Sequence, residues 1–252
     1  NRPELVAWRE RLARTLDGHR QEARAKRQSR GYRTARENLE DLVDPGSFLE
    51  YGQLAVAAQR SRRDYEELQS STAGDGIITG TCTINAGQVG AGRGRAAVIV
   101  NDYSVLAGTQ GVFHHKKLDR LCELAAEHSL PVVMYTEGGG GRPGDTDVLT
   151  QIAGLNVRSF STWAGLSGKV PRIAVNNGYC FAGNAALFGC ADFTIATRNS
   201  WIGMAGPAMI EGGGLGKFDP TEIGPIEVQE KNGVVDIVAQ DEAHATALAR
   251  QL

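Results

Sequence analysis

Residues 131–145 have the sequence PVVMYTEGGGGRPGD, in which an apolar run passes directly into four consecutive glycines. The run at 131–136 predicts a buried strand, and we expect a helix over residues 145–166. Glycine amides can approach a ligand closely, and the N-terminus of a following helix favours negative charge. The stretch therefore indicates an anion-binding loop at a strand end. The alternative is a flexible loop with no chemical role.

Residues 176–187, NNGYCFAGNAAL, form a second candidate site. A strand delivers a tight turn of small residues, and a helix is expected to begin at once over residues 183–188. The amides of Ala182 and Gly183 would then point into a pocket at the positive end of that helix. This is the layout of an oxyanion hole, which stabilises negative charge on a carbonyl oxygen. The alternative is close helix–strand packing that requires small residues.

Both segments belong to a chain in which expected strands and helices alternate. Such alternation predicts an α/β fold with a largely parallel sheet, whose ligands bind at the carboxyl ends of the strands. Residues 55–73 are polar and are expected to be an exposed loop. Asp241 is expected to cap the last helix. The expected strands are 77–84, 96–100, 131–136, 170–175, 192–196 and 234–238, and the expected helices are 110–128, 145–166, 183–188 and 241–252.

The composition of the chain excludes several classes of protein. Among 252 residues there are 32 glycines, about 13% against the roughly 7% that is usual, and they are not periodic as in collagen. Four scattered cysteines without a CxxC pair favour neither a disulfide scaffold nor a zinc ribbon, and they indicate a reducing cytoplasm. No run approaches the ~20 apolar residues of a membrane span, and no signal peptide is evident. Because the chain starts at Asn1, we expect it to be trimmed or a fragment.

The residues needed for metal or serine-nucleophile chemistry are not arranged for it. The only close histidines are His114 and His115, and neighbours on a helix point about 100° apart. No Gly-x-Ser-x-Gly motif occurs, because the run at 165–168 has the wrong spacing. We expect no metal site.

The first 37 residues carry ten Arg, one Lys and five acids, a net charge of +6 in a chain of net charge −2. Leu5, Trp8, Leu12 and Leu16 are spaced as one stripe of a helix over about residues 3–30. The stripe is expected to pack on the body of the chain or on a partner subunit. Alternatively, some of the arginines face an anionic ligand; a nucleic acid is disfavoured because no aromatic residues are interleaved. A second helix is expected over residues 34–42.

Several short motifs follow one another in a recognisable order. They are TARE at 34–37, LVDPGSF at 42–48, DGIITG at 75–80, NDYSV at 101–105, PVV at 131–133, GGGR at 139–142, Ala182-Gly183 and Gly206-Pro207. Together they resemble the N-terminal half of the carboxyltransferase component of biotin-dependent acyl-CoA carboxylases, a family that includes propionyl-CoA carboxylase β subunits. The resemblance runs from about Arg30 to Leu252.

The resemblance implies a fold and a site. The fold would be a crotonase-like (ClpP/crotonase) ββα superhelix with an N-terminal helical extension, divided here into a helical segment at 1–45 and a crotonase-like domain at 46–252. The amides of Ala182 and Gly183 would form the oxyanion hole. Where the family has Asp-Ser-Gly-Gly-Ala-Arg, this chain has Glu137 to Arg142, so Gly139, Gly140, Gly141 and Arg142 would bind substrate. Alanine at 182, where the family has glycine, requires a negative φ.

The resemblance also implies ligands and partners. The substrate would be an acyl-CoA, with Arg33, Arg36 and Lys117 as candidates to bind the CoA phosphates. Biotin would arrive as carboxybiotin on a partner domain, and after CO2 release it would act as the base. The implied partners are a C-terminal carboxyltransferase half, biotin carboxyl carrier and biotin carboxylase domains, and further copies in a homo-oligomer. Neither a nucleic acid nor a membrane is expected as a partner.

Two other functions are compatible with the same residues. One is an enoyl-CoA hydratase or isomerase of the same fold, which requires an acidic general base beside the oxyanion hole; Glu137 is the candidate. The other is a non-catalytic CoA-binding module.

Overall fold

A mixed sheet forms the centre of the chain in this computed structural model, which describes residues 2–148 and 157–252. Among the described residues the sheet has seven strands in the order β1-β2-β3-β4-β5-β7-β9. The first three pair antiparallel and the remaining pairs are parallel, so the prediction of a largely parallel sheet is confirmed. The strands are β1 (Leu49–Tyr51), β2 (Ile77–Thr83), β3 (Arg95–Asn101), β4 (Val132–Tyr135), β5 (Arg172–Asn176), β7 (Phe193–Thr197) and β9 (Ile237–Ala239).

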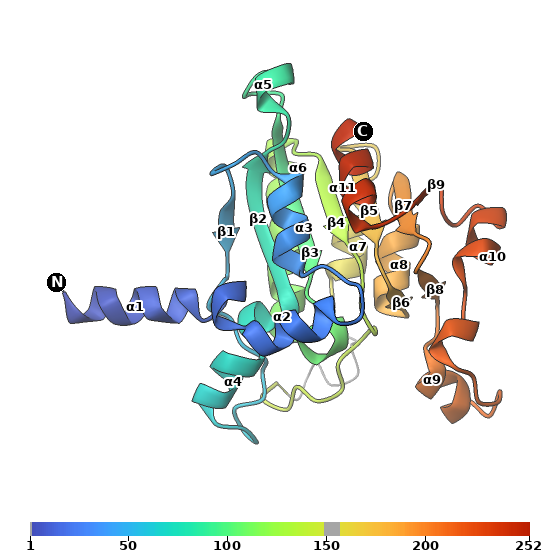
Figure 1. The fold of residues 1–252 in the computed structure, drawn as a ribbon, viewed down its shortest axis with the longest axis horizontal. Coiled ribbons are helices and arrows are strands. Elements are labelled where there is room, and N and C mark those ends of the chain that lie inside the picture. Colours follow the sequence, from blue (N-terminus) through green and yellow to red (C-terminus); the bar gives the residue numbers. More distant parts are fainter. Residues whose placement is uncertain (1, 149–156) are drawn as a thin grey trace.

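Helices cover both faces of this sheet. On one face lie α3 (Ala35–Leu42) and α11 (Glu242–Gln251), whose apolar residues share a core with alternate residues of β2 to β5. On the other face lie α6 (Val112–His128) and α7 (Ser159–Ala164), where Trp163 is fully buried. Figure 1 shows α3 and α11 in front of the sheet. Because both faces are covered, the central strands are apolar at nearly every position, as is usual for parallel strands.

A small two-stranded sheet follows β5 and leads to the second candidate site. It pairs β6 (Tyr179–Phe181) with β8 (Trp201–Gly203), and neither strand was expected from the sequence. Helix α8 (Gly183–Gly189) begins directly after β6, as predicted for residues 183–188. Besides the N-terminal helices α1 and α2, the described residues also form α4 (Tyr65–Ser71), α5 (Ala86–Val89), α9 (Pro207–Gly212), α10 (Ile226–Lys231) and the short 3-10 helices Asp17–His19, Ala73–Gly76, Leu106–Gly108 and Pro220–Glu222.

Two predictions about the middle of the chain are wrong. Residues 145–148 are not helical, because the Asp145 side chain accepts hydrogen bonds from Gln59 and from the Val112 amide. Residues 149–156 lie outside the described part. Within residues 157–166, α7 is the helix that forms. Residues 55–73 are not an exposed loop. They contain α4, and Val56, Ala57 and Leu68 form a small buried cluster.

The N-terminal segment is also not one helix. It divides into α1 (Pro3–Ala13) and α2 (Gln21–Gln28), with Leu16 in an extended conformation between them. The chain turns there because tertiary contacts replace helical ones: the Thr34 hydroxyl donates to Asp17 at 2.5 Å, and Arg20 pairs with Asp102 at 2.6 Å. Helix α2 thereby crosses the lower end of the sheet in Figure 1.

The apolar stripe of α1 does not pack on the body of the chain. Trp8 is 51% exposed and Leu5 is 40% exposed, and α1 has no buried residue. The prediction of packing on the body is therefore wrong, and packing on a partner subunit stays a prediction. Helix α3, in contrast, contributes Leu39 and Leu42 to the main core. The proposed division at residue 45 stays a prediction.

We predict that removal of the cap of α3 destabilises the protein. Thr34 accepts from the Glu37 amide at 3.1 Å, and the Glu37 carboxylate accepts from the Thr34 amide at 2.9 Å. Thr34→Ala should lower the free energy of unfolding by about 2 kcal/mol, because it removes the cap and also the hydrogen bond from the Thr34 hydroxyl to Asp17. Urea denaturation measures this. Thr34→Ser retains the hydroxyl and should stay close to wild type; an equal loss in both variants would contradict the capping role.

Candidate active site

The glycine loop after β4 is fixed from both sides. The Gln110 amide donates to the Gly140 carbonyl at 2.7 Å, and the Arg142 amide donates to the Gln110 carbonyl at 2.9 Å. On the other side, Gly138 exchanges hydrogen bonds with Tyr179 and Phe181 of β6 at 2.7 and 2.9 Å. These bonds do not fit the alternative of a flexible loop.

Only glycine fits at two positions of this loop. A β-carbon at Gly138 would lie 2.2 Å from Asn184 Nδ2 and 2.3 Å from the Gly108 carbonyl oxygen. Gly140 has a φ of +88°, and a β-carbon there would lie 2.7 Å from the Ala182 methyl and 3.6 Å from the Gly183 nitrogen. The loop therefore touches the second candidate site directly, and the two sequence-predicted segments form one site.

The second segment presents one free amide, although two were predicted. The Ala182 amide donates to the Gly203 carbonyl of β8 at 3.0 Å, so its assignment as an oxyanion-hole donor is not supported by this geometry. The expectation of a negative φ at Ala182 is wrong. Its φ is 51° and its ψ is −119°, a conformation that costs a non-glycine residue about 1–3 kcal/mol. The Gly183 amide begins α8 and has no acceptor within residues 2–148 and 157–252.

A second amide without a partner comes from the glycine loop. Within the described part of the chain, the Gly141 amide donates to no protein acceptor, and open space surrounds the position of a β-carbon. Gly139 and Gly140, in contrast, donate to the Ala107 carbonyl and to Asn184 Oδ1, each at 3.0 Å. Gly141 and Gly183 are therefore the available donors where the two loops meet.

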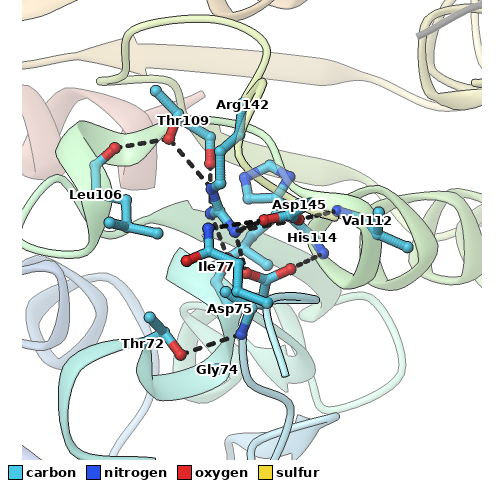
Figure 2. A network of polar contacts seen from close by, with 12 residues as sticks. Thr72, Gly74, Asp75, Ile77, Leu106, Thr109, Val112, His114, Arg142 and Asp145 are labelled. Carbon is cyan, nitrogen blue, oxygen red and sulfur yellow. Dashed lines mark hydrogen bonds and ion pairs between the residues drawn. The ribbon is translucent and has the colours of Figure 1, made fainter. Parts of the chain in front are cut away.

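Arg142 stabilises the loop from inside the protein. Its side chain is 4% exposed and is paired with Asp75 and with Asp145, and it also donates to the Thr109 carbonyl at 2.7 Å. Figure 2 shows the guanidinium group between these two carboxylates. Burial raises the pKa of Asp75, and the positive charge of Arg142 acts against that rise. These contacts give Arg142 a structural role; substrate binding by Arg142 stays a prediction.

The three basic residues that were predicted to bind the CoA phosphates form hydrogen bonds or ion pairs with other protein groups. Arg36 forms a two-pronged pair with Glu50 at 3.0 and 3.2 Å, and Arg33 pairs with Asp41 at 2.5 Å. Lys117 donates to the carbonyls of Gly74 and Ile77, and burial lowers its pKa to about 8. Their assignment as phosphate ligands stays a prediction that these contacts do not support.

A cavity of about 510 Å³ adjoins the glycine loop and is lined by basic and aromatic side chains. Lys26 comes from α2 and Arg30 from the turn that follows it, and neither forms an ion pair with a described residue. Ala107 also lines it and bonds the Gly139 amide, which connects cavity and loop. The sequence indicated only that some N-terminal cations face an anion. The full lining is Ala23, Lys26, Arg27, Arg30, Tyr32, Tyr103, Ala107, Glu137 and Tyr179.

Between cavity and loop lies an ion pair of Arg27 and Glu137. The guanidinium donates to both carboxylate oxygens at 2.8 Å and stacks over the rings of Tyr32 and Tyr103. Burial raises the pKa of Glu137 to about 7, although Arg27 acts in the opposite direction. Because both oxygens are bonded to Arg27, Glu137 is not presented as a general base.

Comparison with known proteins identifies the family. The family described as the carboxyl transferase domain matches residues 26–252. The chain belongs to this family. Among curated relatives of this carboxyl transferase domain, the chain is 32% identical over 98% of its length to the biotin-dependent long chain acyl-coenzyme A carboxylase beta4 subunit of Mycobacterium tuberculosis, of which it covers 44%. It is 31% identical over 89% of its length to the methylcrotonoyl-CoA carboxylase beta chain of Dictyostelium discoideum, of which it covers 36%.

Solved structures confirm the crotonase-like α/β fold. A single-chain, multi-domain long-chain acyl-CoA carboxylase matches all of the chain with a TM-score of 0.95 and 57% identity, and the chain covers 25% of it. Transcarboxylase 12S with methylmalonyl-coenzyme A bound matches 91% of the chain with a TM-score of 0.75 and 27% identity, and the chain covers 42% of it. The chain thus spans less than half the length of these relatives.

Two further properties concern the part of the chain that the structure describes. It contains no group of three or more His, Cys, Asp or Glu side chains placed to hold a metal ion. None of its helices combines the length and the hydropathy needed to cross a bilayer.

We predict that loss of Arg27 makes the stability of the protein depend more strongly on pH. A folded-state pKa near 7, above the 4.5 of a free glutamate, means that the folded protein binds this proton more tightly. The contribution of Glu137 to the free energy of unfolding therefore falls as the pH rises from about 4.5 to 7. Arg27→Gln removes the cation, raises the pKa of Glu137 further and extends the fall to higher pH. We expect a loss of about 3–5 kcal/mol at pH 8.5, as for other broken buried pairs, and a smaller loss at pH 5.5.

Denaturant titrations at the two pH values measure this difference. Arg24→Gln is the matched control, because Arg24 is on the same helix but is half exposed in its pair with Glu37. It should cost under about 0.5 kcal/mol at both pH values. A larger loss for Arg27→Gln at pH 5.5 than at pH 8.5 would contradict the expected direction.

Proposed function

We propose that this chain is the acyl-CoA half of a biotin-dependent carboxyltransferase site, where it stabilises the thioester enolate that accepts a carboxyl group. The observation that carries the proposal is the contact of two loops at Gly140 and Ala182, near a basic, aromatic cavity. Each loop has one amide without a described partner, that of Gly141 or that of Gly183. Family membership supports the reaction type. The 57% identity to a long-chain acyl-CoA carboxylase supports a long-chain acyl group as the first to test.

The two amides supply what this reaction requires. The proton next to a thioester carbonyl is only weakly acidic, so its removal requires stabilisation of the charge that develops on the carbonyl oxygen. Loss of one preorganised donor from such a hole typically costs about 3–4 kcal/mol of transition-state stabilisation. Here Gly141 is held by the bonds on either side of it, and Gly183 lies at the positive end of α8. Both donors are thus in place before substrate arrives.

The cavity suits the nucleotide end of CoA. Lys26 and Arg30, which form no ion pair with a described residue, offer positive charge to phosphate groups, and the aromatic side chains of the lining offer ring surface for the adenine. Ala107 lines this cavity and accepts a hydrogen bond from the Gly139 amide, so the cavity lies next to the glycine loop. A CoA molecule bound in this way would bring its thioester toward Gly141 and Gly183.

The carboxyl donor and the other partners belong to the rest of the enzyme. Carboxybiotin, when bound, supplies the carboxyl group and the base for the α-proton. The amides of Gly141 and Gly183 suit one carbonyl oxygen, and we assign that oxygen to the thioester. Among the described residues, no second pair of donors then remains for the biotin carbonyl at this site, so we assign biotin binding to a C-terminal half. Biotin carboxyl carrier and biotin carboxylase domains complete the reaction. We propose a homo-oligomer, since a related transcarboxylase 12S is a hexamer. Four free cysteines support a cytoplasmic location.

The engagement of Glu137 weighs against a hydratase or isomerase. Such an enzyme requires a free acid beside the hole, whereas both oxygens of Glu137 accept hydrogen bonds from Arg27. Hydration of an enoyl-CoA by the full-length enzyme would restore that alternative. Binding of acyl-CoA without carboxylation, with carboxybiotin present, would indicate a non-catalytic module.

We predict that a side chain at Gly183 blocks turnover. A β-carbon there would lie 2.5 Å from Gln110 Oε1 and 3.1 Å from the Phe160 ring. In the full-length carboxylase, Gly183→Val should lower kcat by about a hundredfold or more, as for loss of a hole donor. Gly189→Val is the matched control on the same helix, where no atom lies within 4 Å of the added carbon. Equal turnover in the two variants would remove Gly183 from the site.

We also predict which basic residue binds CoA. Arg30→Ala should weaken CoA binding by about 1 kcal/mol, roughly fivefold, with a smaller effect on dephospho-CoA if the 3′-phosphate is its partner. Isothermal titration calorimetry measures both. Arg24→Ala, on α2 but outside the cavity lining, is the control. Weaker binding in Arg33→Ala or Arg36→Ala, with Arg30→Ala unchanged, would favour the assignment made from the sequence.

A further inference from the structure

Gln110 is a buried side chain at the candidate site that the family resemblance did not single out. It is 3% exposed and lies between the 3-10 helix Leu106–Gly108 and α6. Its backbone bonds the glycine loop on both sides of Gly141, through Gly140 and Arg142. Its side chain extends to the other loop, where a β-carbon at Gly183 would lie 2.5 Å from Oε1. Gln110 is therefore beside both free amides.

The carboxamide of Gln110 has no partner in the described part of the chain. Its Nε2 is buried and unbonded, and neither polar atom of the side chain forms a hydrogen bond there. Gln59, in comparison, is equally buried and donates to Asp145 at 3.0 Å. A buried amide without a partner opposes folding unless a ligand, an ion or an ordered water satisfies it, and the position of Gln110 at the candidate site favours a ligand.

We propose that Gln110 is a third hydrogen-bond donor of the thioester site. Rotation of its carboxamide exchanges Oε1 and Nε2, so that Nε2–H takes the place beside Gly183 and donates to the carbonyl oxygen of bound acyl-CoA. This inference rests on the proposed function, because it requires an acyl-CoA at the site. A thioester oxygen would satisfy the buried donor. The same bond would strengthen as negative charge develops on that oxygen.

Substitutions of Gln110 can separate a loss of catalysis from a loss of stability. Met has nearly the shape of Gln but no donor, so Gln110→Met replaces an unbonded polar group by an apolar one. Its unfolding temperature should equal or exceed that of wild type, since a structural hydrogen bond is not lost. Gln110→Glu keeps the shape, and its ionised carboxylate only accepts hydrogen bonds.

The test compares two CoA probes on the full-length carboxylase. One probe is a saturated acyl-CoA, and the other is the matching S-alkyl-CoA, in which CH2 replaces the thioester carbonyl. We expect Gln110→Met to weaken binding of the acyl-CoA by threefold to tenfold and to leave the S-alkyl-CoA within twofold. We expect kcat for carboxylation to fall by about tenfold or more in Gln110→Met and Gln110→Glu. Gln88→Met, an exposed site on α5 at the far end of the sheet, is the control.

Each outcome has a distinct meaning. Equal weakening of both probes, or a lower unfolding temperature of Gln110→Met, would show a packing role and overturn the inference. Wild-type binding and turnover in Gln110→Met would also overturn it and would leave the proposed function intact. If wild type binds neither probe, the acyl-CoA site itself fails, and both conclusions fall together.

Discussion

The buried ion pair between Arg142 and Asp75 joins the segments that make up the candidate site. Asp75 precedes β2 and also accepts from the His114 amide of α6 at 2.8 Å. Asp145, which follows the glycine loop, accepts from the Val112 amide at the start of α6 at 2.8 Å and is paired with Arg142. All three charged side chains are almost fully removed from water, where an unpaired charge costs several kcal/mol. The loop therefore cannot move without disturbing α6 and β2 as well.

Local sequence patterns were sufficient to predict the elements that carry the site. The apolar run before the glycine loop forms β4, and the small residues after β5 lead into α8, because both patterns reflect contacts between near neighbours. The expected helix over 145–166 failed at its start for the opposite reason. Asp145 is a good residue to begin a helix, but it is bonded to Gln59 and Val112, which lie far away in the sequence.

The candidate site shows the same limit. A strand, a turn and a helix start predicted free amides at Ala182 and Gly183, and that pattern does not reveal that β8 lies alongside and accepts a bond from Ala182. Likewise, Arg27 and Glu137 are 110 residues apart, so no local pattern could place α2 beside the glycine loop. The basic character of the N-terminal segment was evident, whereas its orientation depends on pairs such as Arg20 with Asp102.

The unusual backbone of Ala182 has a consequence for motion. Glycine would adopt φ 51° and ψ −119° at lower cost, but it would also allow many other conformations. The methyl group of alanine reduces the number of backbone conformations that residue 182 can adopt. Because this methyl group also lies close to Gly140, the glycine loop and the turn before α8 restrict each other. The turn therefore has few alternative conformations open to it, because this steric contact adds to the hydrogen bond from the Ala182 amide to the Gly203 carbonyl.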